Sequence, residues 1–165
     1  MVTGVSQPPL TNKPFRKVSQ RGIKFIHQFE GCVLTAYPDP GTGGAPWTIG
    51  WGSTTDEEGK PIKPGTVWTQ ERADARFAQH LIQFESEVST AIGKNPTTQS
   101  QFDALVSFHY NTGAIARATL TQKHNNGDYI GASKEFLRWN RAGGRVMNGL
   151  TRRRRAEADM YLEGL

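Results

Sequence analysis

A run of apolar residues spaced three or four positions apart constrains the fold of this chain more than any other feature. Its members are Phe77, Leu81, Phe84, Val88 and Ile92. Because this spacing is typical of an amphipathic α-helix, we predict a helix from Thr69 to Ile92, with Thr69 as its N-cap. A helix of that length can join two separate parts of a chain of 165 residues.

The segment before the long helix has the composition of a small β-sheet. Residues 33–37 and 47–52 are strand-like, and the stretch between them, 38–46, is too rich in Gly and Pro to form a helix. A polar loop follows at 54–65. We therefore predict two short antiparallel strands joined by a Gly- and Pro-rich turn.

A short helix is expected ahead of this sheet. Phe25 and Phe29 lie at helical spacing and Ser19 is a suitable N-cap, so the predicted helix extends from Ser19 to Glu30. Gly31 follows, where many helices end in a left-handed residue. Residues 1–17 are polar, contain three prolines and lack the apolar core of a secretory signal, so we expect a flexible N-terminal segment.

Helical periodicity continues after the long helix. Further helices are expected around Phe102–His109, at Ile130–Asn140 and at Thr151–Leu165, with a break at Gly143-Gly144. The predicted fold class is α+β: a small antiparallel β-sheet lobe and a larger all-helical lobe are joined by the long helix, with a cleft between the lobes. Residues 18–165 would form a single domain. No window approaches the roughly 18 continuous apolar residues of a transmembrane helix.

Cysteine and histidine content argue against disulfide or metal chemistry. Cys32 is the only cysteine, which excludes an internal disulfide and fits synthesis in a reducing compartment. The four histidines are scattered, and no two of them have the spacing of a helical zinc site. We therefore expect neither a metal nor a cofactor.

Positive charge is concentrated near the C-terminus. The net charge is +5, and the strip from Arg138 to Arg155 contains seven arginines and no acidic residue. Such a strip suits an anionic polymer, namely bacterial wall, lipopolysaccharide or nucleic acid, although an ordinary solvated surface explains it equally well. Nucleic acid is the weakest of these partners, because no recognition motif accompanies the strip.

Glu30 and Asp39 are the candidates for acid–base chemistry. Glu30 is expected at the C-terminal end of a helix beside Phe29, where the helix dipole and an apolar neighbour disfavour its ionised form. Asp39 lies in the Pro- and Gly-rich turn, where solvent favours the ionised form. Two carboxyl groups in different environments suit the acid and base of glycosidic bond cleavage. Taken alone, each residue is more simply explained by structure, Glu30 as a surface residue at a helix end and Asp39 as a turn residue.

Residues 48–52 add a hydroxyl and an aromatic ring. Thr48 could hold a water between Asp39 and a sugar, although a β-branched residue also simply favours a strand. Gly50 and Gly52 weaken a strand and suggest that substrate or another backbone comes close. Trp51, between them, could stack on a sugar.

The order of these motifs resembles the phage-type lysozymes, the muramidase endolysins that include the T-even phage lysozyme. The matching segments are Phe29-Glu30-Gly31, Ala36-Tyr37-Pro38-Asp39, Thr48-Ile49-Gly50-Trp51-Gly52, Gln101 to Phe108 with Asn111 and Gly113, and Gly149 to Glu157. The resemblance extends from about residue 19 to the end of the chain. The turn between Asp39 and Thr48 is a few residues longer than the family pattern, so Thr42 is an alternative to Thr48 as the source of the hydroxyl. The T-I-G-x-G context favours Thr48.

The resemblance implies a lysozyme-like fold and a mechanism. The enzyme would hydrolyse, with inversion, the β-1,4 bond between N-acetylmuramic acid and N-acetylglucosamine in peptidoglycan. Glu30 would protonate the leaving oxygen while Asp39 and Thr48 orient the attacking water. Inversion predicts carboxyl groups roughly 6.5–9.5 Å apart.

Substrate binding is expected at Trp51, Asn111 and Arg145, although Asn111 is more simply explained as a buried structural amide. The strip Arg152–Arg155 would contact an anionic outer-membrane surface. We expect the protein to be a monomer that does not bind nucleic acid. It would be made in the host cytoplasm and released to the wall with help from a separate holin-like protein. The alternatives are a lytic transglycosylase, which cleaves the same bond without a second carboxylate, and a cationic lytic protein acting through its arginines.

Overall fold

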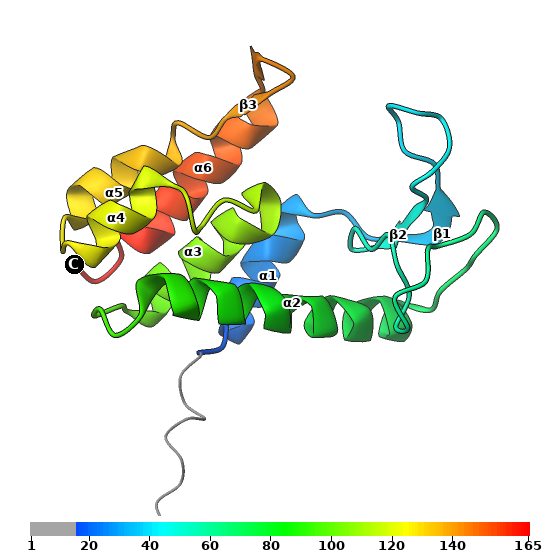
Figure 1. The fold of residues 1–165 in the computed structure, drawn as a ribbon, viewed down its shortest axis with the longest axis horizontal. Helices are drawn as coiled ribbons and strands as arrows, with labels where there is room; N and C mark the ends of the chain where they lie inside the picture. The colour runs from blue at the N-terminus through cyan, green and yellow to red at the C-terminus, as the bar shows by residue number, and fades with distance from the viewer. Residues whose placement is uncertain (1–15) are drawn as a thin grey trace, which may run out of the picture. The chain divides into compact units, whose positions relative to one another are not determined.

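The computed structural model describes residues 16–165, which form two compact units (Figure 1). The sheet unit comprises residues 24–82. The helical unit comprises residues 83–165 together with the residues that precede Lys24. Most of the predicted flexible segment lies outside the described residues. Its last two members, Arg16 and Lys17, are bonded to the helical unit: the Arg16 backbone N–H donates to Ser89 Oγ (2.9 Å) and the Lys17 carbonyl accepts from Gln99 Nε2 (3.0 Å).

Helix α1 (Gln20–Phe29) confirms the short helix expected before the sheet. Ser19 is its N-cap, since the Ser19 hydroxyl accepts a hydrogen bond from the Gly22 N–H at 3.0 Å. The expectation that Gly31 is left-handed is wrong. The chain leaves the helix at Glu30 and enters the next strand at Val33, and this short link turns without a positive φ.

The sheet unit contains the two predicted antiparallel strands, β1 (Val33–Tyr37) and β2 (Thr48–Gly50). Val33 is opposite Gly50, and Tyr37 is opposite Thr48, with an irregularity between these pairs. Strand β2 is shorter than predicted because Gly50 has a φ of 67° and the chain then turns. A side chain at Gly50 would also lie 3.2 Å from the buried Trp68 ring, so the positive φ and this close ring both favour glycine there.

The core of the sheet unit is small and mostly aliphatic. One cluster of its buried residues consists of Ala36, Ile49, Ile62, Trp68 and Ala73, and the partly buried residues packed on them are Cys32, Leu34, Trp47 and Trp51. The long helix α2 (Gln70–Ile92) begins where predicted. Thr69 caps it by accepting a hydrogen bond from the Arg72 N–H at 3.1 Å.

The helical unit contains four further helices: α3 (Gln99–Thr112), α4 (Thr119–Asn125), α5 (Tyr129–Phe136) and α6 (Asn148–Tyr161). The helix predicted over 130–140 ends early, at Phe136. The residues that follow form a hairpin of β3 (Arg141–Ala142) and β4 (Arg145–Val146), so this part of the chain is not entirely helical. Gly143 and Gly144 both have positive φ, which a two-residue turn between strands requires.

The observed architecture confirms the α+β class, with a small antiparallel sheet and a predominantly helical remainder. The cleft expected between two lobes stays a prediction. In the described part of the chain, no helix is both long and apolar enough to cross a membrane.

Candidate active site

Glu30 directly follows α1 and precedes β1. Its backbone N–H donates to the Ile26 carbonyl at 3.0 Å, which continues the helical bonding pattern to this residue. The side chain is half-buried. The expected location at the C-terminal end of a helix is therefore confirmed, and the helix fixes the direction in which this carboxyl group leaves the backbone.

Asp39 lies in a tight turn that begins two residues after β1. Its Oδ2 accepts hydrogen bonds from the N–H groups of Gly41 (3.0 Å) and Thr42 (3.1 Å). Its own N–H donates to the Gly44 carbonyl at 2.9 Å, and its carbonyl accepts from Gly43 at 2.7 Å. Both side-chain bonds use one carboxylate oxygen, so the turn orients the carboxylate while Oδ1 remains available.

The two threonines near Asp39 have different surroundings. Thr42 uses its hydroxyl within the turn, donating to the Ala45 carbonyl at 2.7 Å and accepting from the Gly44 N–H at 3.1 Å. Thr48 is the first residue of β2 and pairs with Tyr37 of β1. Because Asp39 follows Tyr37 by two residues, the strand pairing brings Asp39 and Thr48 to the same end of the sheet.

Trp51 is held by contacts on one ring face and at its N–H. The indole Nε1 donates to Asp74 Oδ1 at 2.8 Å, and the ring stacks on His27 with centroids 3.6 Å apart and planes 3° apart. Asp74 also accepts from Gln70 at 2.9 Å. The hydrogen bond from Trp51 is the main reason that the pKa of Asp74 is lowered. Sequence analysis did not anticipate His27 or Asp74 in this region; the only signal was that His27 precedes Glu30 by three residues on one helix.

Asn111 and Arg145 belong to the helical unit. Asn111 is exposed in the last turn of α3, so the expectation of a buried amide is wrong. The helix ends at Gly113, which has a φ of 67°. Asn111 lines an open hollow of about 500 Å³ together with Trp139 and Arg141. Arg145 is exposed on β4.

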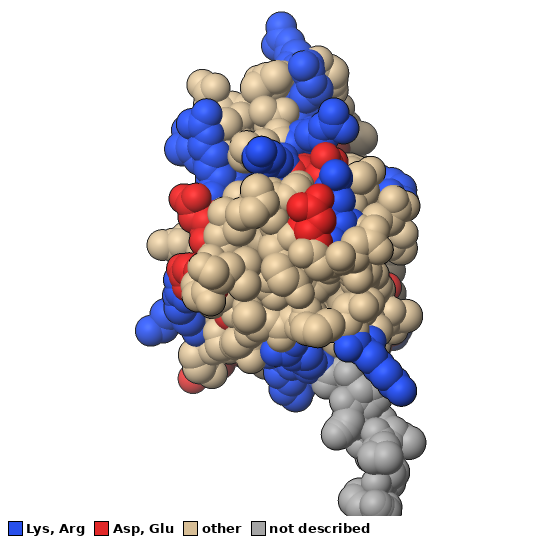
Figure 2. Space-filling view, turned by 90° about the vertical axis from the view of Figure 1, so that its left-hand side faces the viewer, with Lys and Arg blue, Asp and Glu red and all other residues tan. Residues whose placement is uncertain are grey.

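The C-terminal arginines do not form one exposed strip. Arg152 and Arg155 are exposed, but Arg153 and Arg154 are 3% and 0% exposed and pair with Glu157, which is also fully buried. The expectation that all four contact an anionic surface is therefore wrong for the two middle residues. A helix turns by about 100° per residue, so four consecutive side chains cannot share one face. On the face shown in Figure 2, Lys and Arg gather toward the upper end, the height at which Figure 1 shows the β3–β4 hairpin.

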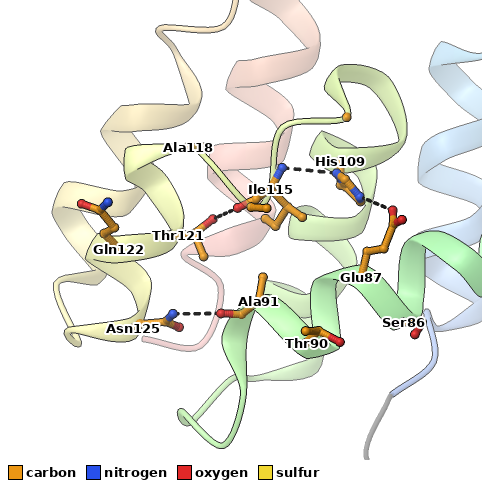
Figure 3. Close-up of a pocket in the computed structure, with 12 residues that line it drawn as sticks. Ser86, Glu87, Thr90, Ala91, His109, Ile115, Ala118, Thr121, Gln122 and Asn125 are labelled. Atoms are coloured by element: carbon orange, nitrogen blue, oxygen red, sulfur yellow. Dashed lines mark hydrogen bonds and ion pairs between the residues drawn. The ribbon is translucent and has the colours of Figure 1, made fainter.

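A second hollow, of about 580 Å³, lies within the helical unit among α2, α3 and α4 (Figure 3). Its central polar pair is His109 and Glu87, with His109 Nε2 and Glu87 Oε1 2.7 Å apart. The hydrogen bond to His109 is the main reason that the pKa of Glu87 is lowered. Sequence analysis did not predict this hollow, and none of its lining residues had been considered catalytic. Across residues 16–165, no three His, Cys, Asp or Glu side chains are grouped as metal ligands.

Comparison with known proteins identifies the class of this chain. A family model described as "Phage lysozyme" matches residues 27–157. An endolysin of Bacillus phage B103 is 40% identical over 149 residues, covering 89% of this chain and 54% of that protein. An endolysin of Acyrthosiphon pisum secondary endosymbiont phage 1 is 37% identical over 150 residues, covering 87% of this chain and 97% of that protein. The chain thus spans about half the length of the first relative and nearly all of the second.

Solved structures give the same result. An endolysin from Escherichia coli O157:H7 phage FAHEc1 is similar with a TM-score of 0.78 and 37% identity, covering 91% of this chain and 96% of that one. The muramidase domain of SpmX from Asticaccaulis excentricus gives a TM-score of 0.75 and 31% identity, covering 89% of this chain and 98% of that one. Fold and relatives together define the class as a protein with the phage lysozyme fold. The chain belongs to the phage lysozyme family.

Proposed function

We propose that this protein is an endolysin that hydrolyses the β-1,4 bond between N-acetylmuramic acid and N-acetylglucosamine, with inversion at the anomeric carbon. The observation that carries this proposal is the Tyr37–Thr48 strand pairing, which brings an oriented carboxylate, Asp39, to the same end of the sheet as a hydroxyl. Such a pair can hold a water molecule for attack on a sugar carbon. Glu30 belongs to the same compact unit.

In this mechanism Glu30 is the general acid that protonates the leaving glycosidic oxygen. Asp39 accepts a proton from the attacking water through Oδ1, since Oδ2 is already bonded to two backbone N–H groups. A positioned acid or base of this kind typically contributes roughly 10²–10⁴-fold to the rate. The inverting outcome requires the two carboxyl groups to be roughly 6.5–9.5 Å apart.

Thr48, rather than Thr42, supplies the hydroxyl in this proposal. Thr42 both donates and accepts hydrogen bonds within its own turn, so its hydroxyl has a structural use already. Trp51, Asn111 and Arg145 are the proposed substrate contacts. Asn111 and Arg145 are exposed and polar, whereas Trp51 can offer a sugar only the parts of its ring that His27 does not cover.

The biological role that follows is lysis of the host cell wall at the end of phage growth. In this proposal the enzyme accumulates in the host cytoplasm and reaches the wall with help from a separate holin-like protein. Two of its relatives carry the name SAR-endolysin, from Bacteriophage PS119 and Enterobacteria phage PA-2, at 36% and 33% identity. Exposed Arg152 and Arg155 are the members of the arginine strip that could contact an anionic surface.

Two other activities remain to be separated from this one. A lytic transglycosylase would cleave the same bond without using Asp39, and a cationic lytic protein would act without Glu30. The bonds that orient Asp39 favour the hydrolase, because a transglycosylase needs no second carboxylate.

Mass spectrometry of digested peptidoglycan tests the proposal. Wild-type protein should release glycan fragments with reducing muramic acid ends, and Glu30→Gln should release almost none. Asp39→Asn should lose activity to a similar extent. Anhydro-muramic ends from the wild type would establish a transglycosylase instead, and intact glycan after treatment would rule out both enzymes.

A further inference from the structure

Helix α1 carries Glu30 at its end, so the position of this carboxyl group depends on what holds the helix against the sheet. His27 lies three residues before Glu30, about one helical turn away. Its imidazole stacks on Trp51 and meets the edge of Phe77 on α2, at centroid distances of 3.6 Å and 4.4 Å. All four residues belong to the sheet unit. His27 therefore joins the helix that carries Glu30 to a β2-linked turn and to α2.

Trp51 is itself fixed from two directions. Its indole N–H is bonded to Asp74 of α2 at 2.8 Å. Its backbone lies in a turn closed by two hydrogen bonds, from Ile49 N–H to the Ser53 carbonyl (2.9 Å) and from Ser53 N–H to the Ile49 carbonyl (2.8 Å). This turn continues directly from β2, so Trp51 is rigidly connected to Thr48.

The imidazole carries an unusual cost that packing alone does not explain. Its Nε2 is buried and makes no hydrogen bond in the described part of the chain. Buried polar atoms without partners are rare and often mark a functional constraint. A leucine would fill such a site without this cost but could not stack flat on Trp51, which indicates that the planar ring serves a purpose other than filling space.

We propose that His27 is a positioning residue: through its stack on Trp51, it fixes the end of α1, and with it Glu30, relative to the strand that begins with Thr48. This inference rests on the proposed function of Glu30 as the general acid. Enzymes lose rate steeply when a catalytic group is displaced, by about 10²-fold for an error of about 1 Å. Loss of the stack should therefore reduce turnover more than substrate binding.

A pair of substitutions at His27 tests the stack directly. His27→Leu keeps an apolar side chain but removes the planar ring, whereas His27→Phe keeps a ring and removes the buried nitrogen. We expect kcat on purified peptidoglycan to fall about 10–100-fold in His27→Leu, with KM changed by less than about threefold. His27→Phe should stay within about threefold of wild-type kcat, because it preserves the stack. Thermal unfolding of each variant establishes that it is folded.

A matched control uses another histidine of the sheet unit. His80 is also half-buried and lies on α2, and burial lowers the pKa of both imidazoles. His80→Leu removes an imidazole of similar burial and leaves the stack of His27 on Trp51 in place, so it should leave kcat near that of the wild type. An equal loss of kcat in His80→Leu and His27→Leu would mean that the effect is a general consequence of removing a half-buried imidazole, and it would overturn the proposal.

Asp74 offers an independent test should His27→Leu fail to fold. Asp74 is exposed, so its substitution is well tolerated by the fold. Asp74→Asn retains an oxygen that accepts the indole N–H, whereas Asp74→Leu does not. We expect kcat to fall about tenfold in Asp74→Leu and to stay near wild type in Asp74→Asn. Equal kcat in the two variants would contradict the proposal.

The outcomes separate this inference from the proposed function. Wild-type protein that releases no reducing ends would defeat the proposed function itself. If the wild type cleaves and Glu30→Gln does not, but folded His27→Leu keeps wild-type kcat, only the positioning inference fails. It also fails if His27→Phe loses as much kcat as His27→Leu.

Discussion

At the scale of single residues, the most consequential group is the buried charge cluster of α6. Glu157 Oε2 accepts hydrogen bonds from Ser107 Oγ (2.6 Å) and Arg153 Nε (3.1 Å). Glu157 Oε1 pairs with Arg154 Nε at 2.7 Å. Burial raises the pKa of Glu157, and the two guanidinium groups oppose that shift. The cluster is stable only as a whole, because each charge is removed from water.

Removing the carboxylate that Arg153 and Arg154 share should therefore strongly destabilise the folded protein. We predict that Glu157→Gln lowers the free energy of unfolding by about 3–5 kcal/mol, because two buried guanidinium groups lose their counter-charge. Urea denaturation measures this. Arg152→Gln, on the same helix but exposed, should change stability by less than about 0.5 kcal/mol. Equal effects from the two substitutions would show that burial of the cluster is not what stabilises it.

Histidine burial predicts a pH dependence of stability. His124 is fully buried between Thr97 Oγ1 (2.8 Å) and the Tyr161 hydroxyl (2.6 Å), and burial lowers its pKa. The unfolded chain then binds a proton more readily than the folded one. The contribution of His124 to stability is fully present above the pKa of the unfolded state, about 6.5. It is lost as the pH falls toward the lower pKa of the folded state.

The expected measurement is the slope of unfolding free energy against pH below about 6.5. His124→Gln keeps hydrogen-bonding groups but cannot titrate. Its slope should be smaller than that of the wild type, by at most about 1.4 kcal/mol per pH unit, which corresponds to one proton. Parallel curves for the two proteins would mean that His124 does not contribute.

At the scale of elements, α3 is the most completely specified helix. Thr98 and Gln101 form a capping box, with Thr98 Oγ1 accepting from Gln101 N–H (3.0 Å) and Gln101 Oε1 accepting from Thr98 N–H (2.8 Å). At the other end, left-handed Gly113 donates its N–H to the His109 carbonyl at 2.7 Å. Both ends are therefore satisfied locally, while the residues between them form the centre of the helical unit.

Thr98→Ala should weaken this helix by removing the side-chain cap. We predict a loss of about 1 kcal/mol in unfolding free energy, within a usual range of about 0.5–2 kcal/mol. Thr90→Ala is a suitable control, since Thr90 is exposed in the last turn of α2 and alanine favours helices. Thr90→Ala should be neutral or slightly stabilising, and a cost equal to that of Thr98→Ala would contradict a capping role.

At the scale of the whole molecule, the net charge of +5 should make the proposed lytic activity sensitive to salt, because the proposed targets, peptidoglycan and an anionic outer-membrane surface, carry negative charge. Exposed Arg152 and Arg155 are available for this attraction, while buried Arg153 and Arg154 are not. Two exposed arginines elsewhere are already paired, Arg21 with Glu163 and Arg72 with Glu57.

Two double variants with the same net charge test where the attraction acts. Arg152→Gln/Arg155→Gln should reduce the dependence of lysis rate on NaCl concentration, because fewer exposed charges remain for salt to screen. Arg21→Gln/Arg72→Gln removes as much charge from paired sites and should have a smaller effect. If the two variants respond alike, net charge governs the attraction and the arginine strip has no special part.

Much of the architecture could be predicted because its causes are local. The period of the apolar residues on α2, the capping side chains of Ser19 and Thr69, and the Gly- and Pro-rich turn before Thr48 act within a few residues of one another. Glu30 at a helix end and Asp39 in a turn followed from the same local signals. Their catalytic roles came from the resemblance and stay predictions.

What only the tertiary structure decided depends on residues far apart in the chain. Helix α4 is short and its sequence has no helical spacing of apolar residues. It is stabilised by packing against α5. Because arginine is charged, the sequence alone predicts that Arg153 and Arg154 are exposed. Their burial depends on Glu157 and on Ser107 of another helix. The stack of His27 on Trp51 joins residues 24 positions apart. Sequence thus determined the elements and their order, while the tertiary structure decided which polar side chains were buried and paired, since a partner's location is set by the fold and not by local spacing.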